Sequence, residues 1–247
     1  MKLLLMADNQ VGLEITRWLL NQYPEDLALI VSVADNDIFT LARDAGLPCI
    51  EFRSNDEVVN NLHSRNLTPD LGLLAWWPKI VKAPLLDTPK RGFINTHPSF
   101  LPYNRGKHYN FWALVEDVPF GVSLHFVNEG IDTGDIVVQK RVPYDWEDTG
   151  GSLYVKASDA MIEIFKEAYP TIRQETIPRF RQNFVEGSFH LAKELDPASR
   201  IDLQKTYTAR ALLNLLRART FPGHPACWFN EGDETFEVRV EIKRKNA

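Results

Sequence analysis

The sequence predicts an α/β fold, with a Rossmann-like, mostly parallel sheet followed by a small C-terminal helix plus β-hairpin. Short apolar runs alternate with helical patterns along the first half of the chain. These runs are apolar on both faces, which is typical of parallel strands covered by helices on either side. From residue 183 onward the composition shifts to glycine, proline and mixed charges, and two alternating stretches near the end flank a turn. We therefore expect a main domain over residues 1–185 and a small extension over residues 186–247.

The main-domain strands are predicted from short runs rich in Leu, Ile and Val that are bounded by turn residues. They lie at residues 2–6, 27–33, 49–51, 71–75, 94–96, 121–127 and 135–142. The helices are predicted where apolar side chains recur at a spacing of three and four residues. They lie at residues 11–23, 38–45, 55–65 and 152–169. In the extension a short amphipathic helix carries Ala209, Leu212, Leu213 and Leu216 on one face, and antiparallel strands follow at residues 226–230 and 235–242.

Bulk properties favour a globular protein of the cytoplasm. The chain has 44% hydrophobic residues and a net charge of −5 with scattered basic residues, which argues against a nucleic-acid partner. Cys49 and Cys227 lie far apart in no metal-like spacing, as expected of two reduced thiols in the cytosol. Asp8 interrupts the opening apolar run too early for a signal peptide, and no stretch reaches the ~18 apolar residues of a membrane span. We expect no membrane partner.

Three polar residues at predicted strand ends point to a chemistry. Asn95 and His97 are two apart in a strand, so their side chains lie on the same face. Asp132 stands in a tight loop flanked by glycines. An amide that donates to an oxyanion, an imidazole that moves protons and a carboxylate that orients it are what acyl transfer to an external amine needs. These three residues are therefore the candidate catalytic group.

The strings around these residues resemble those of the tetrahydrofolate-dependent formyltransferases. They are Asn95-Thr96-His97-Pro98-Ser99 and Asp132-Thr133-Gly134, and the likeness is strong over residues 71–165 and weak over the first 70. The resemblance implies the formyltransferase fold, a catalytic role for Asn95, His97 and Asp132, and N10-formyltetrahydrofolate as co-substrate, released as tetrahydrofolate.

The continuation after the first string resembles one branch of that family. Arg105-Gly106-Lys107-His108-Tyr109-Asn110 is similar to the sugar N-formyltransferases that act on dTDP-amino sugars. This resemblance implies a dTDP-amino-dideoxy sugar as acceptor, with dTDP-4-amino-4,6-dideoxyglucose favoured. It also implies a product for cell-surface glycans such as the O-antigen of lipopolysaccharide, and a homodimer built partly from the C-terminal hairpin. The alternatives are a methionyl-tRNA or phosphoribosylglycinamide formyltransferase, or a non-catalytic nucleotide-sugar binding relative.

The family pattern also suggests which residues bind the two ligands. The folate is expected near the loop after residue 75 and the loop at 127–133, where the cofactor-binding candidates are Trp77, Pro78, Ile80, Asn128 and Gly130. Substrate-binding candidates are Asn9, Gln10, Lys79, Arg105, Lys107, His108, Asn110 and Phe221. Several alternatives stay open. Trp76 and Trp77 fit the protein core and the lining of the folate cleft equally well. Any of the three basic residues at 105–108 fits the pyrophosphate. Phe221 fits a thymine stack or a dimer contact.

A metal site is not expected from the spacing of the histidines and carboxylates. Those considered are His97, His108, His125, Asp132 and Asp135, and they match no simple ligand pattern. Asp135 is expected to be a turn residue. His125, in the middle of a predicted strand, is expected to be packed or hydrogen-bonded there, with contact to the candidate site as an alternative.

Overall fold

The computed structural model describes residues 1–174 and 176–245, and the chain forms two compact units that interleave along the sequence. Unit 1 comprises Met1–His97, Ser123–Gln139 and Met161–Gln182. Unit 2 comprises Pro98–Val122, Lys140–Ala160 and the described residues from Asn183 onward. The division expected at residue 185 stays a prediction about the chain's domains. Each unit is described below by itself.

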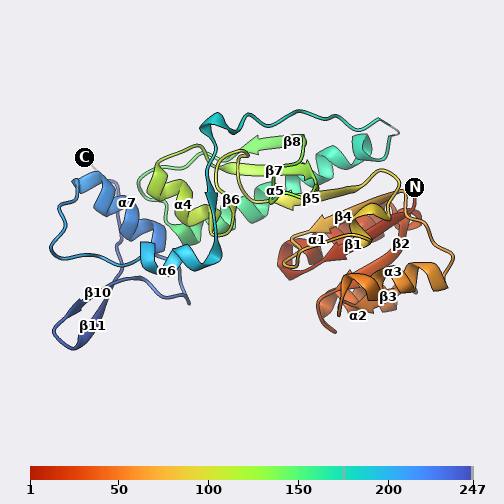
Figure 1. Cartoon of the computed structure of the whole chain (residues 1–247), viewed down its shortest axis with the longest axis horizontal. Coiled ribbons are helices and arrows are strands. Elements are labelled where there is room, and N and C mark those ends of the chain that lie inside the picture. Colours follow the sequence, from red (N-terminus) through yellow and green to blue (C-terminus); the bar gives the residue numbers. More distant parts are fainter. Residues whose placement is uncertain (175, 246–247) are drawn as a thin grey trace. The chain divides into compact units, whose positions relative to one another are not determined.

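A seven-stranded mixed sheet is the frame of the candidate site (Figure 1), in the order β3-β2-β1-β4-β5-β7-β8. The strands are β1 (Leu3–Ala7), β2 (Leu27–Ser32), β3 (Cys49–Glu51), β4 (Leu71–Ala75), β5 (Phe93–His97), β7 (Gly121–Phe126) and β8 (Ile136–Arg141). The first five run parallel, and β7 pairs antiparallel with β5. The predicted mostly parallel α/β sheet is confirmed, and each predicted strand of the main domain is present within one or two residues.

Helices cover the sheet where the apolar periodicity predicts them. They are α1 (Asn9–Gln22), α2 (Asp37–Asp44), α3 (Asn55–Ser64) and α5 (Gly150–Ile172), with short 3-10 turns η1 (Pro24–Asp26) and η2 (Leu85–Asp87). The starts of α2 and α3 each have a side-chain cap. The Asn36 carboxamide oxygen accepts from the Ile38 and Phe39 N–H groups, and the Ser54 hydroxyl accepts from the Glu57 N–H. Among the described residues, no helix combines the length and apolar composition that crossing a membrane requires.

The core of unit 1 explains why these strands are almost wholly apolar. On one face, side chains of β1, β2 and β4 pack with α3 and η2 in a cluster that includes Met6, Val31, Leu62 and Leu85. Elsewhere in the unit, Trp18 of α1 meets Phe165 and Tyr169 of α5 edge to face, with ring centroids 5.9 and 5.7 Å apart. Burial on both faces removes the alternation of polar and apolar residues.

Unit 2 contains the remaining elements, including the predicted C-terminal helix and hairpin. These are β6 (Arg105–Gly106), α4 (Tyr109–Glu116), η3 (Phe184–Glu186), β9 (Phe189–His190), η4 (Ala192–Glu194), α6 (Leu195–Ala198), α7 (Ala209–Arg219), β10 (Cys227–Glu231) and β11 (Glu234–Val238). Strands β10 and β11 pair antiparallel, while β6 pairs with β9 in a two-residue ladder. That ladder is not predictable from sequence, because both strands are too short to show a period.

Candidate active site

Strand β5 carries the amide and the imidazole that the sequence singles out. Its register with β7 sets Asn95 opposite His125 and His97 opposite Ser123. Directly opposed residues in an antiparallel pair have neighbouring side chains on the same face. A second imidazole therefore joins the predicted pair. His97 and His125 are 4% and 2% exposed, whereas Asn95 is half-buried.

The carboxylate of Asp132 lies between the two imidazoles. Its Oδ2 is 3.5 Å from His97 Nδ1, and its Oδ1 is 3.5 Å from His125 Nε2. These are ion-pair distances, and catalytic contacts of this length commonly tighten when substrate is bound. The Nδ1 side of the His97 ring is thus turned to the carboxylate. The predicted group of Asn95, His97 and Asp132 is therefore assembled around one point of unit 1.

The contacts of His125 define its tautomer and orient the Asn95 amide. Its Nδ1 lies 2.8 Å from the carbonyl oxygen of Phe126, which only accepts, so Nδ1 carries a hydrogen. In the neutral ring Nε2 is then an acceptor, and it lies 3.2 Å from Nδ2 of Asn95. One hydrogen of the Asn95 amide is used in this way, and the other is left for an oxyanion. His125 is thus hydrogen-bonded within its strand and in contact with the site, so both alternatives stated for it apply.

A carboxylate with two imidazoles is also a set of metal-ligand types. One ligand atom each from His97, His125 and Asp132 lies within 4.8 Å of the others. The sequence spacing does not indicate this proximity, because it depends on the register of β5 with β7 and on the loop between β7 and β8. Within this set, Asn95 and the Phe126 carbonyl contact the His125 ring.

Left-handed backbone conformations follow two of the parallel strands and recur in the Asp132 loop after β7. Asn9 follows β1 with a φ of +58°, Trp76 follows β4 with +55°, and Asp132 has +54°. Such conformations are costly for residues other than glycine and are concentrated at functional sites. The Trp76 N–H is held by the Thr96 hydroxyl at 2.7 Å, so the end of β4 is tied to β5. Ligands of open α/β sheets bind at the carboxyl ends of the strands.

The first turn after β1 requires a glycine. A Cβ added at Gly12 would lie 2.8 Å from the carbonyl oxygen of Ala75. Helix α1 can therefore begin close to the end of β4 only because residue 12 has no side chain. This glycine serves the close approach of the α1 backbone to the end of β4.

The predicted cofactor residues occupy two loops of unit 1. Trp77 is 9% exposed and belongs to the core cluster, where its ring meets Phe52 at 5.1 Å, so its side chain follows the core alternative. Pro78 and Ile80 are exposed. The Asn128 side-chain oxygen accepts from the Gly130 N–H and the Thr133 hydroxyl, so it shapes the loop that carries Asp132. Binding of a cofactor by these residues stays a prediction.

Three predicted substrate residues belong to unit 1. Asn9 and Gln10 are exposed at the start of α1, where their amides donate to Asp8 and Glu14. Lys79 is exposed in the loop after β4. All three therefore have polar groups that a ligand can reach.

The other predicted substrate residues belong to unit 2. The Arg105 guanidinium lies over the Phe184 ring at 4.8 Å, and Lys107 is exposed. Burial, then the charges of Arg219 and Lys107, hold the pKa of His108 below its usual value. In a separate set of contacts, the Asn110 amide donates to the Gly150 carbonyl at 2.8 Å, and the Phe221 ring packs at a tilt against Tyr154 and His224. Asn110 thus has a structural hydrogen bond, and its contact with substrate stays a prediction.

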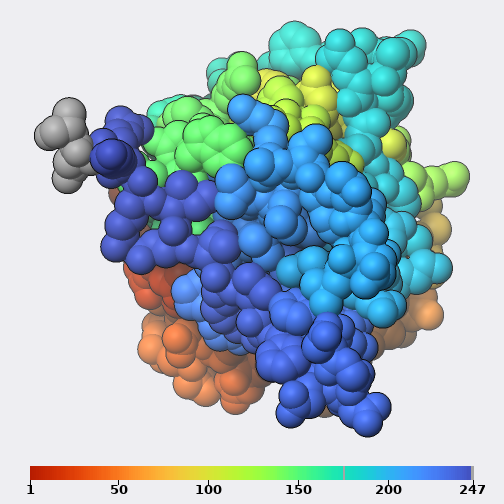
Figure 2. Space-filling view, turned by 90° about the vertical axis from the view of Figure 1, so that its left-hand side faces the viewer, coloured from red at the N-terminus to blue at the C-terminus, as the bar shows by residue number. Residues whose placement is uncertain are grey.

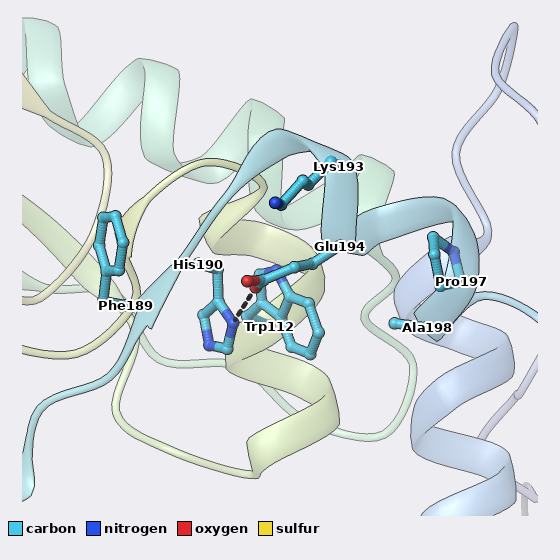
Figure 3. Close-up of a pocket in the computed structure, with 7 residues that line it drawn as sticks. All are labelled: Trp112, Phe189, His190, Lys193, Glu194, Pro197 and Ala198. Carbon is cyan, nitrogen blue, oxygen red and sulfur yellow. Dashed lines mark hydrogen bonds and ion pairs between the residues drawn. The ribbon is translucent and has the colours of Figure 1, made fainter.

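Unit 2 also has an open hollow that contains none of these predicted residues (Figure 3). Trp112, Phe189, His190 and Pro197 are among its lining residues. The His190 ring is stacked on Trp112 with centroids 3.8 Å apart, and it is held between Glu116 at 2.7 Å and Glu194 at 3.2 Å. Glu116 and the Trp112 stack fasten β9 to α4, and Glu194 ties β9 to η4, which gives these residues a structural role.

Two contributors to the site are not recognisable from the sequence. The contact of His125 with Asn95 depends on the β5–β7 register, which no local pattern reveals. Gln182 donates to backbone carbonyls of the Asp132 loop from 50 residues away in sequence. In both cases the signal would have to come from long-range pairing, which a single sequence does not carry.

Comparison with known proteins gives two family matches. Residues 34–169 match a family model described as "Formyl transferase", and residues 194–244 match one described as "N-formyltransferase dimerization C-terminal domain". A dTDP-4-amino-4,6-dideoxyglucose formyltransferase of Mycobacterium tuberculosis is 30% identical over 152 residues, which are 61% of this chain and 64% of that protein. The match thus spans less than two thirds of that relative's length. A methionyl-tRNA formyltransferase of Thermodesulfovibrio yellowstonii is 29% identical over 214 residues, 85% of this chain and 67% of that protein.

Solved structures share the fold over nearly the whole chain. A 4-N formyltransferase from Francisella tularensis superposes with a TM-score of 0.80 at 22% identity, covering 99% of this chain and 98% of that one. An N-formyltransferase from Helicobacter canadensis, solved with folinic acid and dTDP-3-aminofucose, has a TM-score of 0.70 at 19% identity, covering 88% and 80%. At these identities the likeness establishes the fold alone.

Proposed function

We propose that this chain, which belongs to the formyl transferase family, transfers a formyl group from N10-formyltetrahydrofolate to the amino group of a dTDP-amino-dideoxy sugar. The observation that carries the proposal is the convergence of Asn95, His97 and Asp132 at one edge of the sheet. The acceptor class is supported by the match of residues 194–244 and by the dTDP-sugar substrates in the names of a relative and a structural neighbour.

The proposed chemistry assigns one task to each side chain. The sugar amine attacks the formyl carbon, and negative charge develops on the formyl oxygen, to which the free Asn95 N–H donates. His97 Nε2 takes the proton that leaves the attacking nitrogen and returns one to the departing N10 of the folate. Asp132 holds the His97 tautomer and stabilises the imidazolium. The sugar gains one CO, and the co-substrate leaves as tetrahydrofolate.

Ligand contacts are proposed at the residues that the family pattern suggests. The folate ring binds to the backbone of the loops that contain Trp77, Pro78 and Ile80 and, after β7, Asn128 and Gly130. Cationic side chains bind the pyrophosphate, since phosphate oxygens are acceptors only. These cationic side chains are Arg105, Lys107 and His108. The residues proposed to contact the rest of the sugar nucleotide are Asn9, Gln10, Lys79, Asn110 and Phe221.

The position of the amine on the sugar ring is the most specific part of the proposal. We favour dTDP-4-amino-4,6-dideoxyglucose, which is the acceptor named for the mycobacterial relative. The Helicobacter structure holds a 3-amino sugar, so a test needs both kinds of acceptor. The formylated sugar would be used in a cell-surface glycan such as O-antigen.

A homodimer is proposed through the C-terminal hairpin β10–β11. A two-stranded hairpin alone is marginally stable in water, so it needs a surface to pack against. Phe229 and Phe236 stack across the hairpin with centroids 5.4 Å apart, and Phe236 is 42% exposed. In Figure 2 the C-terminal segment, in blue, lies on the face turned to the viewer. The hairpin lies within residues 194–244, which match the family model described as "N-formyltransferase dimerization C-terminal domain".

Methionyl-tRNA is the second candidate acceptor, because the Thermodesulfovibrio relative matches over 85% of the chain. Binding to tRNA releases counterions, so it weakens steeply with salt. Formylation of methionyl-tRNA that falls with salt, with no reaction of any amino sugar, would replace the sugar acceptor in the proposal.

The catalytic assignments are tested by Asn95→Ala, His97→Ala and Asp132→Asn. Each variant should lose about 10²-fold or more in turnover, because each group acts in the transition state, while its melting temperature stays near that of the unchanged protein. A folded variant with turnover close to wild type would remove that residue from the mechanism. Lys90→Ala, which breaks an exposed ion pair with Asp70, is the matched control.

A further inference from the structure

A short segment after α5 runs along the edge of the sheet and reaches the loop of Asp132. This strap, residues 177–182, follows β8 in Figure 1. Phe180 forms an isolated antiparallel bridge with Ile136, in which each N–H donates to the other's carbonyl at 2.9 and 2.8 Å. Ile177 is buried, and the guanidinium of Arg179 lies 3.4 Å from the centre of the Phe126 ring. The strap is therefore attached to both strands that flank the loop.

At its end the strap holds the backbone of the loop itself. Gln182 Nε2 donates to the carbonyl oxygens of Asp132 at 2.8 Å and Gly134 at 2.7 Å. Both hydrogens of one planar amide are thereby used, which defines the separation and direction of the two carbonyls. On its other side the loop is close to β7, since a Cβ on Gly134 would lie 1.8 Å from the Phe126 carbonyl oxygen.

The held residue is also the one with the rare backbone conformation. Asp132 has a φ of +54°, and a non-glycine residue keeps such a conformation only where its surroundings determine it. The hydrogen bond from Gln182 ends on the carbonyl of this same residue. Release of that carbonyl would let the peptide relax, and the carboxylate would move away from His97 and His125. A displacement of about 1 Å is enough to slow a positioned reaction severely.

We infer that Gln182 is a positioning residue, which sets the Asp132 carboxylate between the two imidazoles. The inference rests on the proposed function for its effect on turnover, whereas its effect on the loop depends on the strap contacts alone. Gln182 touches no reacting atom. Its two donors act through the backbone of the loop, so its loss should change the rate of the chemical step and leave affinity for the sugar nucleotide almost unchanged.

The test is Gln182→Met, which removes the donors at similar length and volume. We expect kcat to fall about 10- to 30-fold, with KM for the sugar nucleotide within about twofold of wild type. Arg181→Ala, at an exposed neighbouring position of the strap, is the matched control and should keep wild-type kinetics. In an Asp132→Asn background, Gln182→Met should lower kcat by less than a further factor of about two, because there is no carboxylate left to position. An equal loss in both backgrounds would overturn the inference.

A second measurement does not depend on activity. Hydrogen–deuterium exchange of residues 128–135 should be faster in Gln182→Met than in wild type, and unchanged in Arg181→Ala. Unaltered exchange in Gln182→Met would overturn the inference. If the wild-type protein forms no formylated product, the proposed function fails, and the exchange measurement still decides whether Gln182 holds the loop.

Discussion

Replacement of His125 by phenylalanine tests whether the second imidazole is part of the site. The ring volume is nearly kept at a position that is 2% exposed, while three polar contacts are lost. The contact with Asn95 at 3.2 Å orients the amide that acts on the formyl oxygen, and the contact with Asp132 is 3.5 Å long. In the tautomer that accepts from Asn95, Nε2 carries no hydrogen and forms no ion pair with the carboxylate, so only the Asn95 contact is counted. At about 1–1.5 kcal/mol for that hydrogen bond, the barrier should rise by the same amount. That corresponds to a loss of about 5- to 13-fold in turnover.

The third contact predicts a separate effect on stability. The Phe126 carbonyl loses its donor at 2.8 Å, which should cost about 1–2 kcal/mol in the free energy of unfolding. Initial rates of product formation and thermal unfolding measure the two effects independently. His63→Phe, at an exposed histidine in α3, is the control and should change neither. Turnover of a folded His125→Phe variant within about threefold of wild type would refute the reasoning from these distances.

Three further predictions concern stability, ligand binding and assembly. Burial alone would raise the pKa of Asp26, but hydrogen bonds from Arg173 and Tyr169 outweigh it and lower the pKa below 3.8. Asp26 therefore stabilises the fold above that pH and loses this effect as the pH falls through its folded pKa. Asp26→Asn should lower the melting temperature at neutral pH, and the melting temperature of the variant should fall less steeply in acid than that of wild type. A pyrophosphate bound by His108 favours the imidazolium by its negative charge. The affinity for dTDP should therefore rise as the pH falls below about 6.5, and it should rise more in wild type than in His108→Gln. Equal slopes of dTDP affinity against pH, measured by calorimetry in the two proteins, would contradict this. Phe236→Glu should convert the dimer into monomers, as measured by light scattering. A variant with the mass of the wild-type dimer would show that the interface lies elsewhere.

Local patterns were sufficient for most of the fold. The strands could be predicted because continuous apolar runs mark strands that are buried on both faces, as in Leu71–Ala75. Asn95 and His97 could be paired because residues two apart in a strand share a face. Asp132 could be named a candidate from its carboxylate in a glycine-flanked loop, and the family resemblance supported that role, but its contact with His125 had no local sign.

Long-range pairing accounts for what was not predicted. His125 contacts Asn95 only because β7 runs antiparallel to β5 in one register, and a shift of one residue would turn its side chain to the other face. Gln182 lies in a segment without periodicity, and its importance comes from two carbonyls 48 and 50 residues earlier. Trp77 could not be assigned to core or cleft, because an aromatic after a strand fits both, and its place in the core cluster follows from Phe52 on a distant segment.

The most direct test of the proposed function is the mass of the products after the protein is mixed with N10-formyltetrahydrofolate and a panel of dTDP-3-amino and dTDP-4-amino sugars. The proposal predicts that one amino sugar gains the mass of CO as tetrahydrofolate is released, and that the reaction is lost in His97→Ala. No gain on any amino sugar, with the wild-type protein folded and both ligands present, would contradict the assignment of this site to sugar formylation.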